Sequence, residues 1–172
     1  MDVTKVYFHI YTSPVGSLYI AVNRHGEVLR ISMQSEQTWP EGYAAELNKF
    51  ACGEVEYQLK EYFAGKRQRF DLPLSLIGTP FQLAVWERLQ RLPYGSTITY
   101  GELALKIGNR RAARAVGGAI ARNPVPILVP CHRVLPASGG IGSYALRSLP
   151  DGSGTDTKRF LLQLEQALPE TV

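Results

Sequence analysis

The sequence predicts an α+β protein with a β-rich N-terminal domain and a mostly helical C-terminal domain. Short runs rich in Val, Ile and Tyr, separated by turn residues, fill the first part of the chain. Helix capping signals and helical periodicity dominate from Thr79 onward. The 172 residues suffice for one ordinary domain or two small ones. We therefore expect residues 1–78 to form the β-rich domain with a connector, and residues 79–172 to form the helical domain.

The composition is typical of a soluble globular protein, with 45% hydrophobic and 20% charged residues. No apolar run reaches the roughly 18 residues that a membrane span needs. The N-terminus alternates like a strand and lacks the apolar block of a signal peptide. We therefore expect no membrane association and a cytoplasmic location, or a nuclear one if the source is eukaryotic.

Three strands and a helix are predicted in the N-terminal domain. The strands are the runs "KVYFHIY", "SLYIAV" and "VLRISM", separated by the turn signals "SPVG" and "NRHG". A helix is expected over residues 54–65, where Gly65 ends it. Residues 71–80 then form a connector to the second domain.

Two capping boxes mark the first helices of the C-terminal domain. Thr79 is followed three residues later by Gln82, and Thr99 is followed at the same spacing by Glu102. The first helix continues through apolar residues at helical spacing, Phe81, Val85 and Leu89, and stops at "LPYG". The second helix covers residues 100–108.

A third helix, over residues 110–122, follows a tight turn and completes a helix-turn-helix candidate. Its apolar stripe is predicted to be buried and comprises Ala112, Ala115, Val116, Ala119 and Ile120. Its outward face holds only arginines and very small residues, namely Arg110, Arg111, Arg114, Gly117, Gly118, Ala121 and Arg122. The two glycines indicate close approach of another backbone, either a nucleic-acid strand or a neighbouring helix. Such small side chains predict little sequence preference in DNA binding.

The net charge of +4 is unevenly distributed. Residues 1–80 carry 8 basic and 9 acidic side chains, whereas residues 81–172 carry 11 and 6. This asymmetry is consistent with a polyanionic partner for the second domain and equally with a solvated basic face.

Cys131 lies next to His132 and Arg133 in the proline-rich stretch "NPVPILVPCHRVLPASGG". A neighbouring positive charge lowers the pKa of a cysteine and makes it a nucleophile. Adjacent side chains on a regular strand point to opposite faces, so the pair cooperates only if the backbone bends or a water bridges them. The dipeptide alone is more often structural than catalytic.

Glu165 supplies a third member for this group. In the last predicted helix, residues 157–168, it lies on the same side as the apolar stripe of Leu161, Leu162 and Leu168. A buried carboxylate needs a partner, and His132 is a suitable one, giving a Cys-His-Glu chain. The alternative is that Glu165 lies at the edge of the stripe and reaches water.

Metal and disulfide chemistry have little support in the sequence. Cys52 and Cys131 are the two cysteines, and the three histidines, His9, His25 and His132, show no ligand spacing. We expect both thiols to be free, with Cys52 a buried or incidental one.

Residues 79 to 165 resemble the O6-alkylguanine-DNA alkyltransferase family, also called methylated-DNA–protein-cysteine methyltransferases. The matching pieces are "GTPFQLAVWERL", "PYGSTITYGELA", "RRAARAVGGAIARNPVPILVPCHRV", "GSY" and "LLQLE", in the family's order. The N-terminal third is similar in layout only, and the resemblance implies a ribonuclease-H-like fold there.

The resemblance implies that Cys131 takes the alkyl group from O6 of guanine. His132 would deprotonate Cys131 through a water, Glu165 would hold His132, and Asn123 would brace the turn before the active-site segment. Because a thioether cannot be hydrolysed by nearby groups, the protein would act once per molecule. The mechanism requires neither a metal nor an organic cofactor.

The same resemblance implies roles in binding DNA and the flipped base. Arg114 would fill the gap left by the flipped nucleotide, and Tyr100 would help to rotate the 3′ phosphate. The recognition helix would enter the minor groove with Ala112, Ala113, Gly117, Gly118 and Arg122 at the contact. The substrate pocket would be formed by Pro126, Val134, Tyr144 and Ala145.

One departure from the family pattern is the longer stretch "ALRSLPDGSGTDTK" after Tyr144. It predicts a longer active-site loop, over residues 145–157, that admits groups bulkier than methyl. Ala145 stands where some members have serine, so a contact to O6 there would come from the backbone N–H.

The expected partner is double-stranded DNA carrying O6-alkylguanine, with O4-alkylthymine as a second candidate. We expect a monomer in solution and allow for cooperative assembly on DNA. The rival hypotheses are a DNA-damage-binding protein without transfer, a cysteine hydrolase that uses the same three residues, and a regulator with a thiol sensor.

Overall fold

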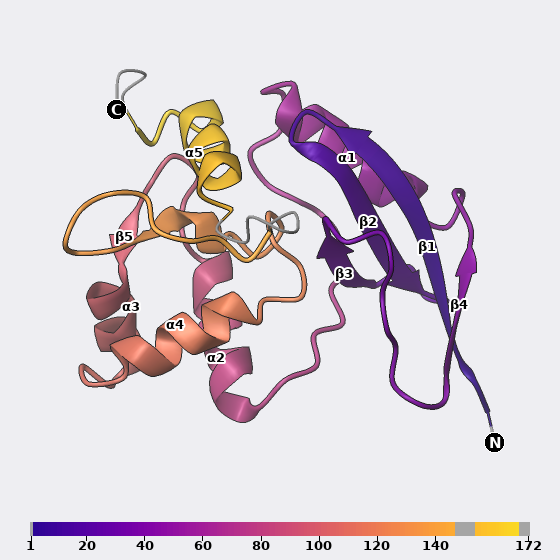
Figure 1. Ribbon diagram of the computed structural model, residues 1–172, viewed down its shortest axis with the longest axis horizontal. Coiled ribbons are helices and arrows are strands. Elements are labelled where there is room, and N and C mark those ends of the chain that lie inside the picture. Colours follow the sequence, from indigo (N-terminus) through magenta and orange to yellow (C-terminus); the bar gives the residue numbers. More distant parts are fainter. Residues whose placement is uncertain (1, 147–153, 169–172) are drawn as a thin grey trace. The chain divides into compact units, whose positions relative to one another are not determined.

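The computed structural model describes residues 2–146 and 154–168. The chain divides into two compact units, Met1–Leu76 and Ile77–Val172. The first contains a β-sheet and one helix, and the second is mostly helical (Figure 1). The predicted α+β fold class is therefore confirmed. Within the described residues, no helix is long and apolar enough to cross a membrane.

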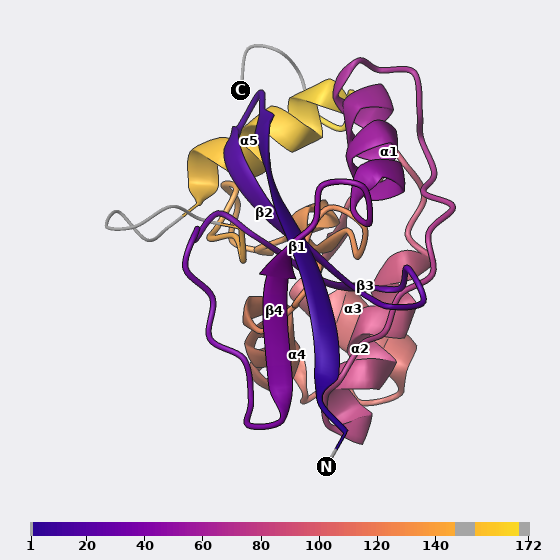
Figure 2. The same cartoon turned by 90° about the vertical axis from the view of Figure 1, so that its right-hand side faces the viewer.

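The first unit contains a four-stranded sheet with the order β3-β2-β1-β4, which can be followed in Figure 1, and Figure 2 shows β4 beside β1. Strands β1 (Thr4–Ser13), β2 (Gly16–Asn23) and β3 (Val28–Ser32) are antiparallel neighbours, at the three places that the sequence predicts. Strand β4 (Tyr43–Leu47) pairs in parallel with β1 and was missed. Its residues after Tyr43 are all exposed, so this short edge strand shows no apolar alternation.

Helix α1 (Gly53–Phe63) packs on the sheet through Val55, Leu59 and Tyr62, all buried. At its N-terminus the buried Cys52 thiol lies 3.5 Å from the Tyr7 carbonyl oxygen and 3.6 Å from that of Ile20. Burial raises the pKa of Cys52 to about 12. Cys52 is therefore a protonated core thiol.

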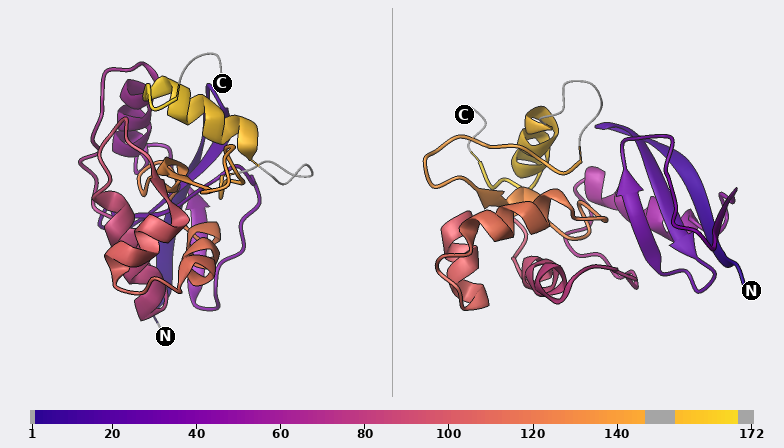
Figure 3. Two further views of the ribbon diagram at one scale, coloured as in Figure 1. Left: turned by 90° about the vertical axis from the view of Figure 1, so that its left-hand side faces the viewer. Right: turned by 60° about the horizontal axis from the view of Figure 1, so that its bottom comes forward.

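The second unit holds α2 (Pro80–Gln90), β5 (Ile98–Thr99), α3 (Tyr100–Ile107), α4 (Ala113–Ala121), a 3₁₀ turn (Cys131–Arg133), β6 (Val134–Leu135) and α5 (Thr155–Leu164). Helices α2 and α3 both contact α4, and the 3₁₀ turn contacts α5 (Figure 3). Both predicted capping boxes form, with the Thr79 and Thr99 side chains each accepting a backbone N–H three residues on. Trp86 of α2 donates to the Ala119 carbonyl at 2.9 Å and ties α2 to α4.

Helix α4 begins three residues later than the sequence predicts. The Asn109 side chain accepts the backbone N–H of Arg111 at 3.1 Å, and the Asn109 carbonyl accepts that of Ala112. These local bonds form a turn in place of the first helical turn. Ala115, predicted to be buried, is exposed, whereas the other four residues of the predicted stripe, Ala112, Val116, Ala119 and Ile120, are buried.

Candidate active site

The backbone bends at the cysteine, as cooperation with its neighbour requires. Cys131, His132 and Arg133 form a single 3₁₀ turn, and all three are buried. The approach to this turn is irregular, with Ile127 at a φ of 78° although it is β-branched. That conformation is unfavourable for such a residue and indicates that the surrounding contacts impose it.

Asn123 fixes the loop that leads from α4 to Cys131. Its Oδ1 accepts the backbone N–H of Val125 at 3.0 Å. Its Nδ2 donates to the Val129 carbonyl at 2.8 Å and lies 3.2 Å from the Cys131 sulfur. One buried amide therefore sets both the loop and the position of the thiol.

Glu165 is buried at the C-terminal end of α5 and contacts the 3₁₀ turn. Its Oε2 lies 2.6 Å from His132 Nε2, and Arg133 donates to both carboxylate oxygens, at 2.8 and 3.1 Å. Glu165 is 2% exposed, so the alternative in which it reaches water does not apply. Arg133, to which the sequence assigned no role beyond its charge, is part of this network.

The electrostatics of this network set the imidazole tautomer. Burial disfavours the charged form of Glu165, but the hydrogen bonds and charges of His132 and Arg133 hold its pKa well below the usual range. Burial lowers the pKa of His132 against the effect of Glu165. A neutral imidazole that donates from Nε2 keeps a lone pair on Nδ1, and Nδ1 has no hydrogen-bond partner among the described residues.

The sequence predicted that His132 and Arg133 supply the positive charge that favours the Cys131 thiolate. In the structure this charge comes from Lys158 instead. Both neighbouring side chains turn toward Glu165. Burial raises the pKa of Cys131 to about 11, opposed by the Asn123 hydrogen bond, the Lys158 charge and backbone N–H groups that include that of Ala145.

Lys158 itself is 1% exposed, and burial lowers its pKa to about 8. Sequence reasoning missed it, although Lys158 and Glu165 share the buried stripe of α5 with Leu161 and Leu162, at a helical spacing of i, i+3, i+4 and i+7. A lysine on such a stripe is the signal that could have found it.

A small pocket of about 40 Å³ is bounded in part by Ala145, whose backbone N–H bonds to the Cys131 thiol, although Cys131 itself is not in the lining. It is lined by Tyr100, Gly117, Ile120, Ala121, Ser143, Tyr144 and Ala145. Four of these were predicted as site residues, and Ile120, Ala121 and Ser143 were missed. Burial, and then the charge of the Cys131 thiolate, raise the pKa of Tyr100, another residue of this lining. Pro126 and Val134 are buried and do not line it.

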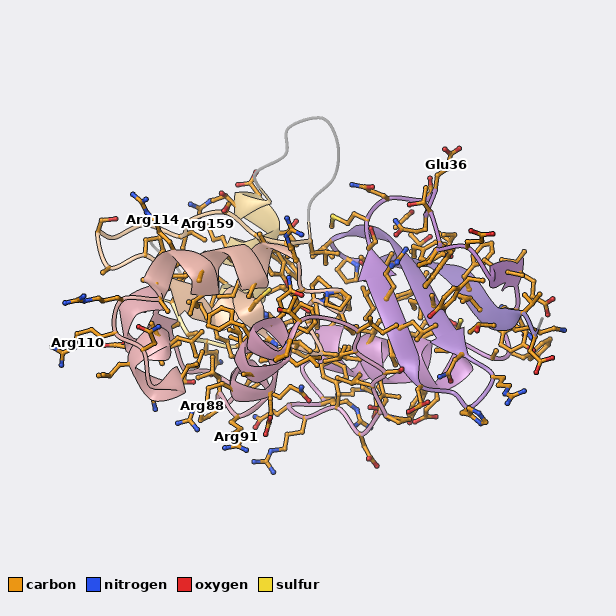
Figure 4. The ribbon with its side chains drawn as sticks, turned by 90° about the horizontal axis from the view of Figure 1, so that it is seen from below. Glu36, Arg88, Arg91, Arg110, Arg114 and Arg159 are labelled. Atoms are coloured by element: carbon orange, nitrogen blue, oxygen red, sulfur yellow. The ribbon has the colours of Figure 1, made fainter. Side chains whose placement is uncertain are left out.

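The outward face of α4 is open and basic. Arg114, Gly118 and Arg122 are exposed, and Figure 4 shows Arg110 and Arg114 projecting from this unit. A methyl group added at Gly118 would meet nothing within 4 Å, so packing against a neighbouring helix does not explain this glycine.

Three further predicted contacts of α4 are less open. A methyl group at Gly117 would meet only the Tyr100 ring, at 4.0 Å. Ala113 is half-buried, and the Ala112 side chain is buried, which leaves its backbone for any contact with a ligand.

Most of the predicted loop over residues 145–157 lies outside the described residues, and the adduct range remains a prediction. Among the residues that are described, no group of three His, Cys, Asp or Glu side chains is arranged to hold a metal ion.

Two family models match the chain in sequence order. The 6-O-methylguanine DNA methyltransferase ribonuclease-like domain matches residues 6–76, and the DNA binding domain of the same family matches residues 80–167. The first match extends the resemblance to the N-terminal part, where the sequence showed similarity in layout only.

Curated relatives match over nearly the whole chain. The methylated-DNA–protein-cysteine methyltransferase of Methanosarcina acetivorans is 42% identical over 166 residues, covering 93% of this chain and 98% of that protein. The constitutive methylated-DNA–protein-cysteine methyltransferase of Bacillus subtilis is 40% identical over 164 residues, covering 93% and 95%.

Solved structures agree with this assignment. Mycobacterium tuberculosis OGT in complex with DNA has a TM-score of 0.82 at 38% identity, covering 94% of this chain and 93% of that chain. Mycobacterium tuberculosis O6-methylguanine methyltransferase has a TM-score of 0.79 at 38% identity, covering 96% of each chain. On the matched domains and on these relatives, the chain belongs to the family of methylated-DNA–protein-cysteine methyltransferases.

Proposed function

We propose that this protein repairs double-stranded DNA by transferring the alkyl group of O6-alkylguanine to its own Cys131, once per molecule. The observation that carries the proposal is the buried Cys131 thiol, held by Asn123 and coupled to Lys158, in a unit whose outward helix is basic and open. Family membership supplies the class of substrate, because the relatives are named for methylated DNA and a protein cysteine.

The proton path follows from the tautomer of His132. Nδ1 takes the thiol proton through a water molecule, and Glu165 stabilises the imidazolium that forms. The thiolate attacks the saturated alkyl carbon, a C–S bond forms, and the C–O6 bond breaks with its electron pair on oxygen. The guanine anion that leaves then takes up a proton, and the His132 imidazolium gives up the proton that it took from the thiol. The thioether product is permanent, so each molecule reacts once.

Cys131 is 1% exposed, so a base stacked in a duplex could not reach it. The guanine would have to leave the stack, and Arg114 on the exposed face of α4 would fill the gap. Tyr100, at the start of α3 and in the pocket lining, would help to rotate the 3′ phosphate.

The rest of α4 would lie in the minor groove. Close approach would occur through Ala113, Gly117, Gly118, Arg122 and the backbone of Ala112. The absence of long side chains at most of these positions agrees with weak sequence preference.

At about 40 Å³ the pocket is much smaller than a purine, so it would have to widen to enclose the extruded base. Tyr144 would contact its ring, backbone groups near Cys131 and Val134 would read its edges, and the backbone N–H of Ala145 would contact O6. Pro126, which is buried, would bound the space for the alkyl group. O4-alkylthymine offers the same alkyl carbon on an exocyclic oxygen and is a second candidate substrate.

The experiment that tests the proposal is intact and peptide mass spectrometry after incubation with excess O6-methylguanine duplex DNA. We expect one added methyl group per molecule, located on Cys131 and never exceeding one. Cys131→Ser should remain unmodified and still bind DNA, and Cys52 should stay unmodified throughout because its thiol is in the core of the sheet unit. Tight DNA binding with an unmodified Cys131 would instead identify a damage-binding or regulatory protein.

A further inference from the structure

Arg133 makes more contacts in the active site than its place beside Cys131 and His132 suggests. It is 6% exposed, and its Nε and Nη2 atoms donate to the two oxygens of Glu165 at 2.8 and 3.1 Å. Its Nη1 donates to the Leu92 carbonyl at 2.6 Å. Two parallel bonds from a planar guanidinium fix the plane of a carboxylate, which a single donor cannot do.

The "LPYG" segment before β5 completes this support. The Arg133 guanidinium lies 5.8 Å from the centroid of the Tyr94 ring, and the Tyr94 hydroxyl donates to the Leu164 carbonyl at 3.4 Å. Gly95 has a φ of 79°, and a side chain there would meet the Glu165 carbonyl oxygen at 3.1 Å. The segment therefore packs against the end of α5 where the carboxylate is attached.

The orientation of Glu165 determines which imidazole nitrogen is available. With Oε2 at 2.6 Å from His132 Nε2, the carboxylate holds the proton on Nε2 and leaves Nδ1 as the acceptor. We propose that Arg133 is a positioning residue for the alkyl transfer proposed above, clamping Glu165 so that a neutral His132 offers Nδ1 to the thiol proton. This inference rests on the proposed function and extends it. Neither the "PCHRV" motif nor the apolar stripe of α5 indicates such a role for Arg133.

The sign of the electrostatic effect follows from the groups that face the imidazole. Glu165 and Lys158 act on it from α5 and Arg133 acts on it from the 3₁₀ turn, while the centroid of the Tyr144 ring lies 6.1 Å from that of the imidazole. Burial lowers the pKa of His132 most, Glu165 raises it, and the positive charges of Arg133 and Lys158 lower it. Without Arg133 the negative charge of Glu165 acts on His132 with less opposition, so His132 takes a proton at higher pH and Nδ1 no longer accepts one.

The test compares single-turnover methyl transfer from saturating duplex DNA as a function of pH in three variants. Arg133→Gln removes both the positive charge and the paired hydrogen bonds to Glu165, whereas Arg133→Lys keeps the charge but loses the paired bonds. Arg67→Gln is the matched control. Arg67 makes two bonds to Glu61 in the other unit, at 3.1 and 2.9 Å.

We expect Arg133→Gln to move the midpoint of the acid limb to higher pH. If the midpoint rises by about 1 in pH, the rate below it falls about tenfold and recovers at alkaline pH. Arg133→Lys should be slower than the wild type at every pH but keep its midpoint, and Arg67→Gln should match the wild type. A purely structural role would lower the rate of Arg133→Gln by one factor at all pH values, and that outcome overturns the proposal.

A second measurement needs neither a folded Arg133 variant nor alkyl transfer. In a His9→Gln/His25→Gln chain, His132 is the single remaining histidine. Nitrogen NMR of the ¹⁵N-labelled ring should show a protonated Nε2 and an unprotonated Nδ1 near neutral pH. A doubly protonated ring, or a proton on Nδ1, would refute the clamp. If Cys131 stays unmethylated in the mass spectra while the ring shows the expected tautomer, the proposed function fails, whereas the Glu165–His132 arrangement on which Arg133 acts is retained.

Discussion

Lys158 shows at the scale of single residues how a buried charge is accommodated near a buried thiol. Its ammonium group donates to the Ser143 carbonyl at 3.2 Å and lies 6.0 Å from the centroid of the Tyr100 ring. Burial lowers its pKa to about 8, and the Cys131 thiolate, when it forms, raises it. The two groups therefore stabilise each other's charged forms, whereas desolvation disfavours each of them alone.

Replacement of Lys158 by Met should move the reactivity of Cys131 toward higher pH. Without the positive charge the pKa of the thiol rises further above its value of about 11, and the thiolate fraction at a given pH falls about tenfold for every increase of about 1 in that pKa. The measurement is the pH dependence of alkylation by a small thiol reagent, followed on Cys131 by peptide mass spectrometry. Lys106→Met, at an exposed position of α3, is the control that should leave the profile unchanged. An identical profile in both variants would show that Lys158 does not act on the thiol.

At the scale of elements, the glycine on the outward face of helix α4 weakens the helix but leaves its surface open. Its buried side holds Val116, Ala119 and Ile120, while Gly118 faces open space. Glycine costs a helix about 1 kcal/mol relative to alanine, and nothing in the described protein requires it at this position. A ligand that approaches the helix closely is the remaining physical reason.

Substitution of Gly118 therefore separates stability from DNA binding. Gly118→Ala should raise the free energy of unfolding by up to about 1 kcal/mol, because the side chain meets no protein atom within 4 Å. Gly118→Leu should also fold but should weaken duplex DNA binding, since its side chain occupies the space where the backbone of DNA would lie. Urea unfolding and fluorescence anisotropy with labelled duplex check the two effects, with Ala84→Leu on α2 as the exposed control. Unchanged DNA affinity in Gly118→Leu would remove α4 from the interface.

The elements also show where prediction from sequence succeeds. Both capping boxes and the three strands β1 to β3 follow from local residue types, because the hydrogen bonds and apolar alternation involved are local. Strand β4 has no such local signal, since it exists through its pairing with β1. The predicted start of α4 was wrong for a local reason, the competing side chain of Asn109.

At the scale of the whole molecule, stability and the active site depend on the same buried ionisable groups. The folded state keeps the pKa of Glu165 and of His132 below their ordinary values of 4.5 and 6.5. In both cases the unfolded chain binds more protons at acid pH than the folded chain does. Stability should therefore decrease as the pH falls, first below 6.5 through His132 and then below 4.5 through Glu165.

Urea unfolding of the second unit as a function of pH tests this expectation. In Trp39→Phe the single remaining tryptophan is Trp86, which is buried in α2 and reports on this unit. We expect the urea midpoint to fall between pH 6.5 and 4.5, and this part of the decrease should disappear when His132→Gln is added. The same decrease in both chains would mean that other groups control the acid transition.

The sequence by itself determined the fold class, the order of the helices, the basic helix and the family, because each depends on local periodicity or on a contiguous motif such as "PCHRV". It also indicated Glu165, since a carboxylate on an apolar stripe is a local anomaly. Tertiary structure alone decided which charge faces the thiol and which one holds the carboxylate. Lys158 reaches the Cys131 site from α5, and Arg133 turns away from its neighbour Cys131 to bind Glu165. The physical reason is that electrostatic coupling depends on distance and burial in the folded chain and not on separation along the sequence.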